Sequence, residues 1–283
     1  MTRWLITGAG GGLGAALASA ALARGDAVAG TMRRPEGLAG FEAAAPGRAK
    51  GFLLDLRDEA GVKTVVSEAE AALGGIDVLV NNAGYGLVGA VEEASLEEVR
   101  AQFEVNVFGA LAMIQAVLPA MRARRAGRII NVTSVSGLAT WAGTGIYCAS
   151  KFALEALGQT LADEVAAFGI KVTNVAPGGM RTDYASRSLV ETRAPIADYD
   201  GGVARQSRDI LKDHAGEEPG DPARVAAAIF AVVDSPMPPT HLLLGADALH
   251  YATRQMAGLL AEIGEWGAVT TSTAFALARR DNP

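Results

Sequence analysis

A tyrosine and a lysine stand four residues apart, at Tyr147 and Lys151. On a helix this spacing places both side chains on one face. A free tyrosine titrates near pH 10, too high for a base at neutral pH, but a neighbouring ammonium group favours the phenolate. We therefore expect Lys151 to lower the pKa of Tyr147, so that the tyrosine can exchange a proton with a substrate oxygen.

A serine precedes this pair by thirteen residues, at Ser134. Its hydroxyl can donate and accept, so it can orient a carbonyl or alcohol oxygen. Each residue alone has a structural interpretation, because an i,i+4 pair is often a surface pair and a serine after a strand is often a helix cap. Only their joint order and spacing point to chemistry.

A glycine-rich stretch, Thr7-Gly8-Ala9-Gly10-Gly11-Gly12-Leu13-Gly14, follows a short apolar run near the N-terminus. An alanine-rich helical pattern continues from it to Arg24. Glycines let the backbone approach a pyrophosphate, and a helix N-terminus offers free N–H groups and the positive end of its dipole. The commonest dinucleotide fingerprint needs a glycine where Leu13 stands, so the pattern here is T-G-x-x-x-G-x-G, built on Gly8, Gly12 and Gly14.

This loop resembles that of the short-chain dehydrogenase/reductases, in the single-domain branch. The tail after residue 241 is similar to hydroxysteroid and retinol dehydrogenase-like members. Further motifs of the family follow in order between residues 55 and 182: Asp55-Leu56, Asn81-Asn82-Ala83-Gly84, Asn106, Ser134, Tyr147-Cys148-Ala149-Ser150-Lys151, Pro177-Gly178 and Thr182.

The resemblance implies an oxidoreductase that uses NAD(P)(H) to interconvert a ketone or aldehyde and an alcohol. Hydride transfer is accompanied by proton exchange through Tyr147 as general acid/base, Lys151 holds the nicotinamide ribose, and Asn106 binds a water that relays protons to Lys151. The implied cofactor-binding residues, apart from the basic pair considered next, are Thr7, Gly8, Gly12, Leu13, Gly14, Asp55, Leu56, Asn82, Ala83, Gly84, Tyr147, Lys151, Pro177, Gly178 and Thr182.

The end of the second predicted strand bears on the choice of cofactor. NAD enzymes place an acidic residue there to bind the ribose 2′-hydroxyl. This sequence has Arg33 and Arg34 and no acid. Because arginine can bind a 2′-phosphate in a bidentate way, we expect NADP(H) rather than NAD(H). Gly11 argues the other way, since many NADP-dependent members carry a basic residue in the glycine loop.

Short β-branched or aliphatic runs alternate with helical patterns along the chain. This alternation predicts an α/β doubly wound (Rossmann) fold, a parallel sheet covered on both faces, in one domain spanning 1–283. The family implies seven strands in the order 3-2-1-4-5-6-7. The expected strands are Trp4–Thr7, Ala27–Thr31, Gly51–Leu54, Val78–Asn81, Arg128–Thr133, Lys171–Val175 and His241–Leu244.

Two segments depart from this alternation. Residues 182–220 are polar with little apolar periodicity, which indicates a substrate lid that is poorly ordered without ligands. Residues 246–273 look helical and are expected to cap the domain. The candidate substrate residues are Ser134, Trp141, Tyr147, Gly179 and Tyr184, and the apolar lining around them suits a mostly hydrophobic small molecule. Trp4 and Trp266 are expected to be packing residues.

Composition narrows the function further. The net charge of −6 argues against a nucleic-acid partner. Cys148 is the only cysteine, and with His214, His241 and His250 it makes no metal-ligand spacing, so no metal is expected. The apolar stretches Gly109–Met121 and Val225–Val233 are shorter than the roughly 20 residues of a membrane span. With no targeting signal at the N-terminus, the expected location is the cytoplasm.

The residues also bear on other possible functions of the chain and on its oligomeric state. The competing function is a non-catalytic NADP-sensing regulator on the same fold, marked by loss of Tyr147 or Lys151, and both residues are present. An epimerase or dehydratase of the longer branch would carry a larger C-terminal domain. Apolar residues on several faces of the helices around Asn106 and Tyr147 predict a homo-oligomer, since excess apolar surface must be covered; the alternative is a monomer in which the C-terminal helix covers it. The family resemblance implies pairing of these helices across a two-fold axis, as in a homodimer or homotetramer.

Overall fold

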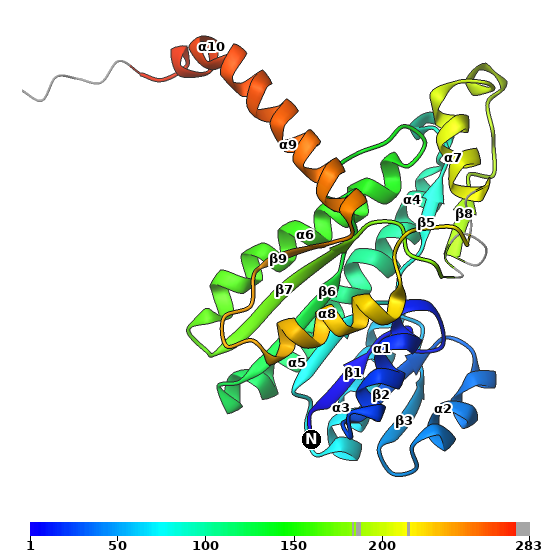
Figure 1. Ribbon diagram of the computed structural model, residues 1–283, viewed down its shortest axis with the longest axis vertical. Coiled ribbons are helices and arrows are strands. Elements are labelled where there is room, and N and C mark those ends of the chain that lie inside the picture. Colours follow the sequence, from blue (N-terminus) through cyan, green and yellow to red (C-terminus); the bar gives the residue numbers. More distant parts are fainter. Residues whose placement is uncertain (183, 185–187, 214–215, 276–283) are drawn as a thin grey trace, which may run out of the picture.

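A seven-stranded parallel sheet forms the centre of the computed structural model, which describes residues 1–182, 184, 188–213 and 216–275 (Figure 1). The strand order β3-β2-β1-β4-β6-β7-β9 confirms the expected 3-2-1-4-5-6-7 arrangement. The strands are β1 (Arg3–Ile6), β2 (Ala27–Met32), β3 (Ala49–Leu53), β4 (Val78–Asn81), β6 (Gly127–Val132), β7 (Ile170–Pro177) and β9 (His241–Leu244).

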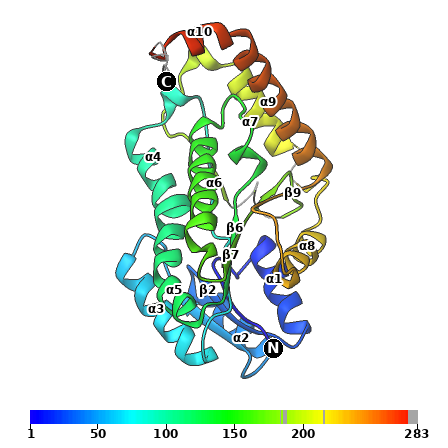
Figure 2. The ribbon, with the colours of Figure 1, turned by 90° about the vertical axis from the view of Figure 1, so that its left-hand side faces the viewer.

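The helices cover the sheet in two layers (Figure 2). One face carries α1 (Gly12–Ala23), α2 (Leu38–Ala44) and α8 (Pro222–Asp234), and the other carries α3 (Glu59–Leu73), α5 (Ala110–Arg124) and α6 (Gly145–Ala166). Because both faces are covered, the central strands are buried almost continuously, as in β2 and β4.

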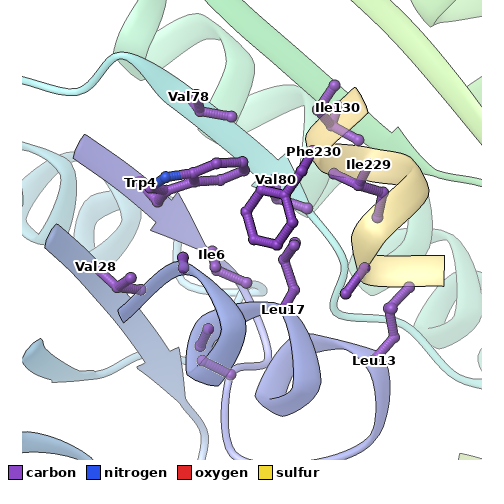
Figure 3. Close-up of a cluster of buried hydrophobic side chains, with 14 of the residues drawn as sticks. Trp4, Ile6, Leu13, Leu17, Val28, Val78, Val80, Ile130, Ile229 and Phe230 are labelled. Atoms are coloured by element: carbon purple, nitrogen blue, oxygen red, sulfur yellow. The ribbon is translucent and has the colours of Figure 1, made fainter. Parts of the chain in front are cut away.

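A large cluster of apolar side chains fills the layer under α1 and α8 (Figure 3). Trp4 of β1 is fully buried and meets Phe230 of α8 edge to face, with ring centroids 5.3 Å apart. Its indole Nε1 donates to Asp26 Oδ2 at 3.1 Å. The expectation that Trp4 is a packing residue is confirmed.

The longest continuous helical run joins α4 (Leu96–Phe103), the π-helix η3 (Glu104–Gly109) and α5. This 29-residue run is long and apolar enough to cross a membrane by length and composition alone, and it is longer than the Gly109–Met121 stretch predicted from the sequence. Its inner face carries the buried polar residues Gln102 and Asn106, and α5 packs against α3. The run is therefore a packed layer of the fold.

The segment 182–220 is better anchored than its polar composition predicted. Its described part forms β8 (Leu189–Glu191), the 3₁₀ turn η6 (Ala197–Tyr199) and α7 (Val203–Asp213), and β8 pairs with β5 (Gly86–Val88) in a second, two-stranded sheet. The sequence-based expectation counted only apolar anchors, whereas the structure adds charged ones. That the segment is poorly ordered without ligands stays a prediction.

The principal anchor joins the buried side chains of Arg205 in α7 and Glu93 in the 3₁₀ turn η2 (Val91–Glu93). Glu93 also accepts from the backbone N–H groups of Ala90 at 2.8 Å and Ile196 at 2.7 Å. Burial acts to raise the pKa of Glu93, but the hydrogen bond from Arg205, helped by these two N–H groups, holds it below its usual range. The carboxylate thereby fixes three parts of the chain to one point.

The C-terminal segment is helical, as expected, in α9 (Ala246–Glu265) and α10 (Gly267–Ser272). However, α9 projects away from the body of the molecule and does not cap it along its length (Figure 1). Only its first turns pack, through the buried Ala248 and Ala252. Trp266 is 61% exposed, so the expectation that it packs is wrong within this chain.

Candidate active site

A cavity of about 1580 Å³ opens at the carboxyl ends of the central strands, where doubly wound folds bind ligands. The predicted residues come together there from segments far apart in the sequence. Those that line it are Gly8, Gly12, Leu13, Arg33, Arg34, Asp55, Leu56, Asn82, Ala83, Gly84, Ser134, Tyr147, Lys151, Pro177, Gly178, Gly179, Thr182 and Tyr184.

The glycine loop forms one wall of the cavity, and its conformation requires glycine. Gly8 and Gly12 have positive φ angles of 70° and 53°. A Cβ atom on Gly14 would lie 2.4 Å from the carbonyl oxygen of Gly8, so any side chain there would displace the loop. The first turn of α1 lacks a side-chain cap among the described residues, which leaves its N–H groups available to an anion.

Thr7 holds this loop in place from behind and does not line the described cavity. Its Oγ1 accepts hydrogen bonds from the backbone N–H groups of Asn82 at 2.9 Å and Ala83 at 3.0 Å. In return, Asn82 Nδ2 donates to the carbonyl oxygen of Thr7 at 2.8 Å. Thr7 and Asn82 thus join the ends of β1 and β4, and the predicted cofactor role of Thr7 is indirect.

The far end of the cavity is basic. Arg33 and Arg34 follow β2 and are exposed at its wall, as the sequence predicted. Sequence reasoning missed Arg57, which also lines the cavity and binds Asp55 through Nε at 3.0 Å from Oδ1. The hydrogen bond from Arg57, with Arg33 acting more weakly, lowers the pKa of Asp55. The sequence signal for Arg57 was its position two residues after Asp55, a predicted cofactor-binding residue.

The catalytic candidates lie at the opposite end. Ser134 follows β6 and accepts from the backbone N–H of Ser136 at 3.0 Å, so it caps the 3₁₀ turn η4 (Val135–Gly137) while facing the cavity. Tyr147 and Lys151 lie one turn apart in α6. Lys151 Nζ donates to the carbonyl oxygen of Val132 at 2.9 Å and lies 5.8 Å from the centre of the Tyr147 ring.

Asn106 is buried behind this group in the π-helix η3 and does not line the described cavity. Its Oδ1 accepts from the backbone N–H of Tyr85 at 3.1 Å. Its Nδ2 donates to the carbonyl oxygen of Tyr85 at 2.9 Å and to Ser150 Oγ at 3.1 Å. Asn106 therefore ties the loop after β4 to α6, one residue before Lys151.

Burial shifts the pKa values of both Tyr147 and Lys151 in the ligand-free chain. Burial raises the pKa of Tyr147, and the hydroxyl groups of Tyr184 and Ser134 beside it only partly oppose this effect. In the ligand-free chain the Lys151 ammonium group bonds the Val132 carbonyl oxygen. The expected lowering, which Lys151 would share with a positively charged oxidised nicotinamide, therefore stays a prediction for the cofactor-bound chain. Burial also lowers the pKa of Lys151 from 10.5 to about 8, against the opposing effect of Glu155.

The substrate candidates divide into two groups. Tyr184 packs beside Tyr147, with ring centroids 6.1 Å apart, and its buried hydroxyl lies beside that of Tyr147. Trp141 instead lies outside the described cavity wall, packs in a small core beneath α9 and meets Tyr251 edge to face. The apolar wall that sequence reasoning missed comprises Val105, Leu189, Val190, Ile210 and Leu211.

A glycine cradle at a helix N-terminus, a basic far end and a Ser–Tyr–Lys group share one cavity. This combination defines a dinucleotide-dependent oxidoreductase site on a doubly wound fold. Among residues 1–182, 184, 188–213 and 216–275, no cluster of His, Cys, Asp and Glu side chains could hold a metal ion. His214 lies outside the described residues.

The chain belongs to the short-chain dehydrogenase family, whose model matches residues 3–192. Oxidoreductase BOA17 of Botryotinia fuckeliana is 36% identical over 276 residues, which cover 97% of this chain and all of that protein. The 3-ketodihydrosphingosine reductase of Bacteroides thetaiotaomicron is 37% identical and covers 85% of this chain and 87% of its own length.

Solved structures agree with this assignment. A short-chain dehydrogenase from Streptomyces avermitilis superposes with a TM-score of 0.90 at 41% identity, covering 97% of this chain and 100% of its own. ElxO with NADP bound has a TM-score of 0.74 at 25% identity, and the match covers 88% of this chain and 99% of ElxO. A Burkholderia phymatum member in complex with NAD, at 24% identity, supports the fold alone, with a TM-score of 0.80 and coverage of 92% and 95%.

Proposed function

We propose that this protein is an NADP-dependent carbonyl reductase or alcohol dehydrogenase that acts on a mostly hydrophobic substrate. The observation that carries the proposal is the convergence of Ser134, Tyr147 and Lys151 with the glycine cradle in one cavity. A bound nicotinamide cofactor would supply or accept the hydride. The uncapped N-terminus of α1 and the glycines before it would hold its pyrophosphate.

The residues of the chain handle the proton and the orientation. Ser134 orients the substrate oxygen through its hydroxyl, and Tyr147 exchanges a proton with that oxygen. Because burial raises the pKa of Tyr147, the ligand-free tyrosine holds its proton at neutral pH. This state suits a proton donor in carbonyl reduction. In alcohol oxidation, Tyr147 must first be deprotonated, which requires positive charge close to its hydroxyl.

The preference for NADP rests on the basic far end of the cavity. Arg33 and Arg34 stand directly after β2, where NAD enzymes carry an acid, although the exposed Glu36 of the following 3₁₀ turn (Pro35–Gly37) also lines the cavity. We expect Arg33→Ala to weaken NADPH binding more than tenfold while NADH binding changes little, as measured by cofactor fluorescence. An equal loss for both cofactors would contradict this assignment.

The proposed substrate class rests on the apolar wall opposite the glycine loop. Leu189, Val190 and Leu211 bring aliphatic surface to the cavity from the segment 182–220, and Val105 adds more from η3. Few fixed charges face the Tyr147 end. An apolar ketone or aldehyde fits this lining better than a charged metabolite.

The test is a panel of apolar ketones and aldehydes with NADPH and with NADH, followed by the absorbance of the reduced cofactor. Tyr147→Phe should abolish turnover and leave NADPH affinity nearly unchanged. Tyr251→Phe in α9, which is 40% exposed and lies outside the described cavity wall, is the matched control and should retain full activity. Tight NADPH binding with no turnover on any substrate would instead favour a sensing regulator.

We also propose a homodimer or homotetramer. Phe108 of η3 is 52% exposed and Phe152 of α6 is 40% exposed, although both lie in helices that pack together at the core. The alternative, that α9 covers this surface within one chain, is not supported, because α9 contacts mainly β9 and η4. Light scattering at micromolar concentration should give at least twice the 29.0 kDa chain mass, and a monomeric mass would contradict the proposal.

A further inference from the structure

Three asparagines and a histidine lie side by side across four neighbouring strands. Asn81 of β4 is in register with Asn131 of β6, which is in register with Asn174 of β7, which is in register with His241 of β9. Side chains in register on parallel strands project from the same face of the sheet. The three asparagines are at most 4% exposed, whereas the His241 side chain is 38% exposed.

Hydrogen bonds join these residues into one chain with a single direction. Asn81 Nδ2 donates to Asn131 Oδ1 at 3.0 Å, and Asn131 Nδ2 donates to Asn174 Oδ1 at 3.0 Å. Asn174 Nδ2 then donates to Glu155 Oε2 of α6 at 2.9 Å. Asn81 Oδ1, at the far end, has no partner among the described residues. The amide dipoles thus all point their donors toward the Glu155 carboxylate.

Glu155 is 5% exposed and needs these partners, because a buried carboxylate without hydrogen bonds is strongly unfavourable. Oε1 also lies within hydrogen-bond distance of Thr133 Oγ1, and Oε2 lies 2.9 Å from His241 Nδ1. Helix α6 approaches the row of asparagines closely at Gly158, where a Cβ atom would lie 1.9 Å from Asn174 Oδ1.

This carboxylate borders the catalytic group on two sides. Glu155 lies one helical turn after Lys151 in α6, and both side chains are buried. Thr133, which contacts Glu155 Oε1, directly precedes Ser134. Glu155 is not among the four catalytic candidates, Asn106, Ser134, Tyr147 and Lys151, and it is not part of the family motifs found in the sequence.

We propose that Glu155 is a positioning residue that keeps Lys151 protonated at neutral pH, and that the asparagine row and His241 hold Glu155 in place for this purpose. The proposal rests on the proposed function for its catalytic consequence, but the charge relation itself does not. Burial lowers the pKa of Lys151 to about 8, and the Glu155 carboxylate acts in the opposite direction. Without that carboxylate, the effect of burial would be unopposed and the ammonium form would be less favoured near neutral pH.

The other charged and titratable groups on the elements around α6 are bonded to other residues, exposed, or on the far side of Glu155 from Lys151 along the row. Tyr147 and Cys148 share the helix with Lys151, and His241 faces Glu155 from the edge strand. Glu98 of α4 bonds Ser95 and Arg193. In β6, Arg128 bonds the carbonyl oxygen of Ser235, and Lys171 lies beside it at the start of β7. In the helical run before α5, Glu97 pairs with Arg193, and Arg100 and Glu104 are exposed.

The experiment measures the pKa of Lys151 directly in the ligand-free full chain, by NMR of lysines labelled with carbon-13 at the ε position. Lys151→Met assigns the signal. Glu155→Gln keeps the shape and removes the charge, and it should lower the pKa of Lys151 by about one pH unit. Glu164→Gln, an exposed carboxylate later in α6, is the matched control and should leave that pKa unchanged.

A second variant covers the case in which Glu155→Gln does not fold. His241→Lys, at the exposed end of the row, places a permanent cation beside Glu155 and should lower the pKa of Lys151 by about half a unit. An unchanged pKa in a folded variant overturns the proposal, even if its thermal stability falls. With a substrate in hand, the alkaline limb of the kcat profile should move toward lower pH by the same amount. A shifted pKa without any turnover would refute the proposed function and leave this inference intact.

Discussion

The buried lysine at the centre of the site should make the protein less stable than it would be without it. Lys151 is 5% exposed, and burial lowers its pKa from 10.5 to about 8. A fall of this size corresponds to about 3 kcal/mol of stability lost when the protonated lysine is buried. We therefore expect Lys151→Met, which keeps an unbranched side chain, to raise the free energy of unfolding at pH 7.

The gain in the free energy of unfolding from Lys151→Met is smaller than the full cost of burying the protonated lysine. Removing Nζ also removes its hydrogen bond to the Val132 carbonyl oxygen, which offsets about 1–2 kcal/mol. The expected stabilisation is therefore about 1–2 kcal/mol. The same variant should lose turnover, because a site that holds a charge in a buried place trades stability for function.

The dependence on pH separates this explanation from better packing by methionine. Below pH 8 the folded and unfolded chains both hold the proton, so the penalty is constant. Between about pH 8 and 10.5 the folded chain releases its proton first, and the wild type gains stability as the pH rises. The difference between variant and wild type should therefore shrink across this window.

Urea unfolding followed by circular dichroism, without cofactor, measures this difference at pH 7 and about pH 9.5. Lys63→Met, at an exposed position in α3, is the control and should change stability by less than about 0.5 kcal/mol. The reasoning is refuted if Lys151→Met is less stable than the wild type at pH 7, or if the difference does not narrow at the higher pH.

Three further predictions follow from the site. Gly14→Ala should abolish NADPH binding, because its Cβ would meet the Gly8 carbonyl oxygen at 2.4 Å, whereas Gly11→Ala, with open space around it, should bind nearly as the wild type does in fluorescence titration. Arg205→Leu should speed proteolysis between residues 188 and 213, because it removes the ion pair with Glu93. Acid should have the same effect on the wild type, because the pKa of Glu93 is lowered in the folded chain and the ion pair weakens as this carboxylate is protonated. Activity should survive EDTA, and restoration by added zinc or magnesium after a loss would contradict this.

The sheet could be predicted from the sequence because its signal is local. Each central strand is a short apolar run between turns, and β4 and β9 have the predicted bounds. The pair β5 and β8 could not be predicted in this way. Each has only three residues, and they pair across about a hundred residues of chain, so neither carries a periodicity of its own. Helix α7 was missed for a related reason, since its anchor is the charged Arg205.

Side-chain environments were harder to predict than positions. Tyr147 and Lys151 lie where the motif required, but the pKa of the tyrosine moves upward, because nothing in an i,i+4 spacing reports how deeply the pair is buried. Trp141 shows the same limit. Its place after Ser134 suggested a cavity wall, yet it packs in the small core beneath α9 and meets Tyr251 edge to face. Burial depends on what the rest of the chain brings to a position.

The row of asparagines shows most clearly where sequence reasoning ends. Asn81, Asn131 and Asn174 each stand in a buried strand, and singly each is an unfavourable polar residue in an apolar run. Their partners are 43 to 50 residues away and become neighbours only because parallel strands require long crossovers and are set in register by them. Buried polar groups persist when they are satisfied, so three such residues in three strands argue for hydrogen bonds among them that end at a buried acceptor. The structure identifies this acceptor as Glu155, one turn from the lysine on which the proposed chemistry depends.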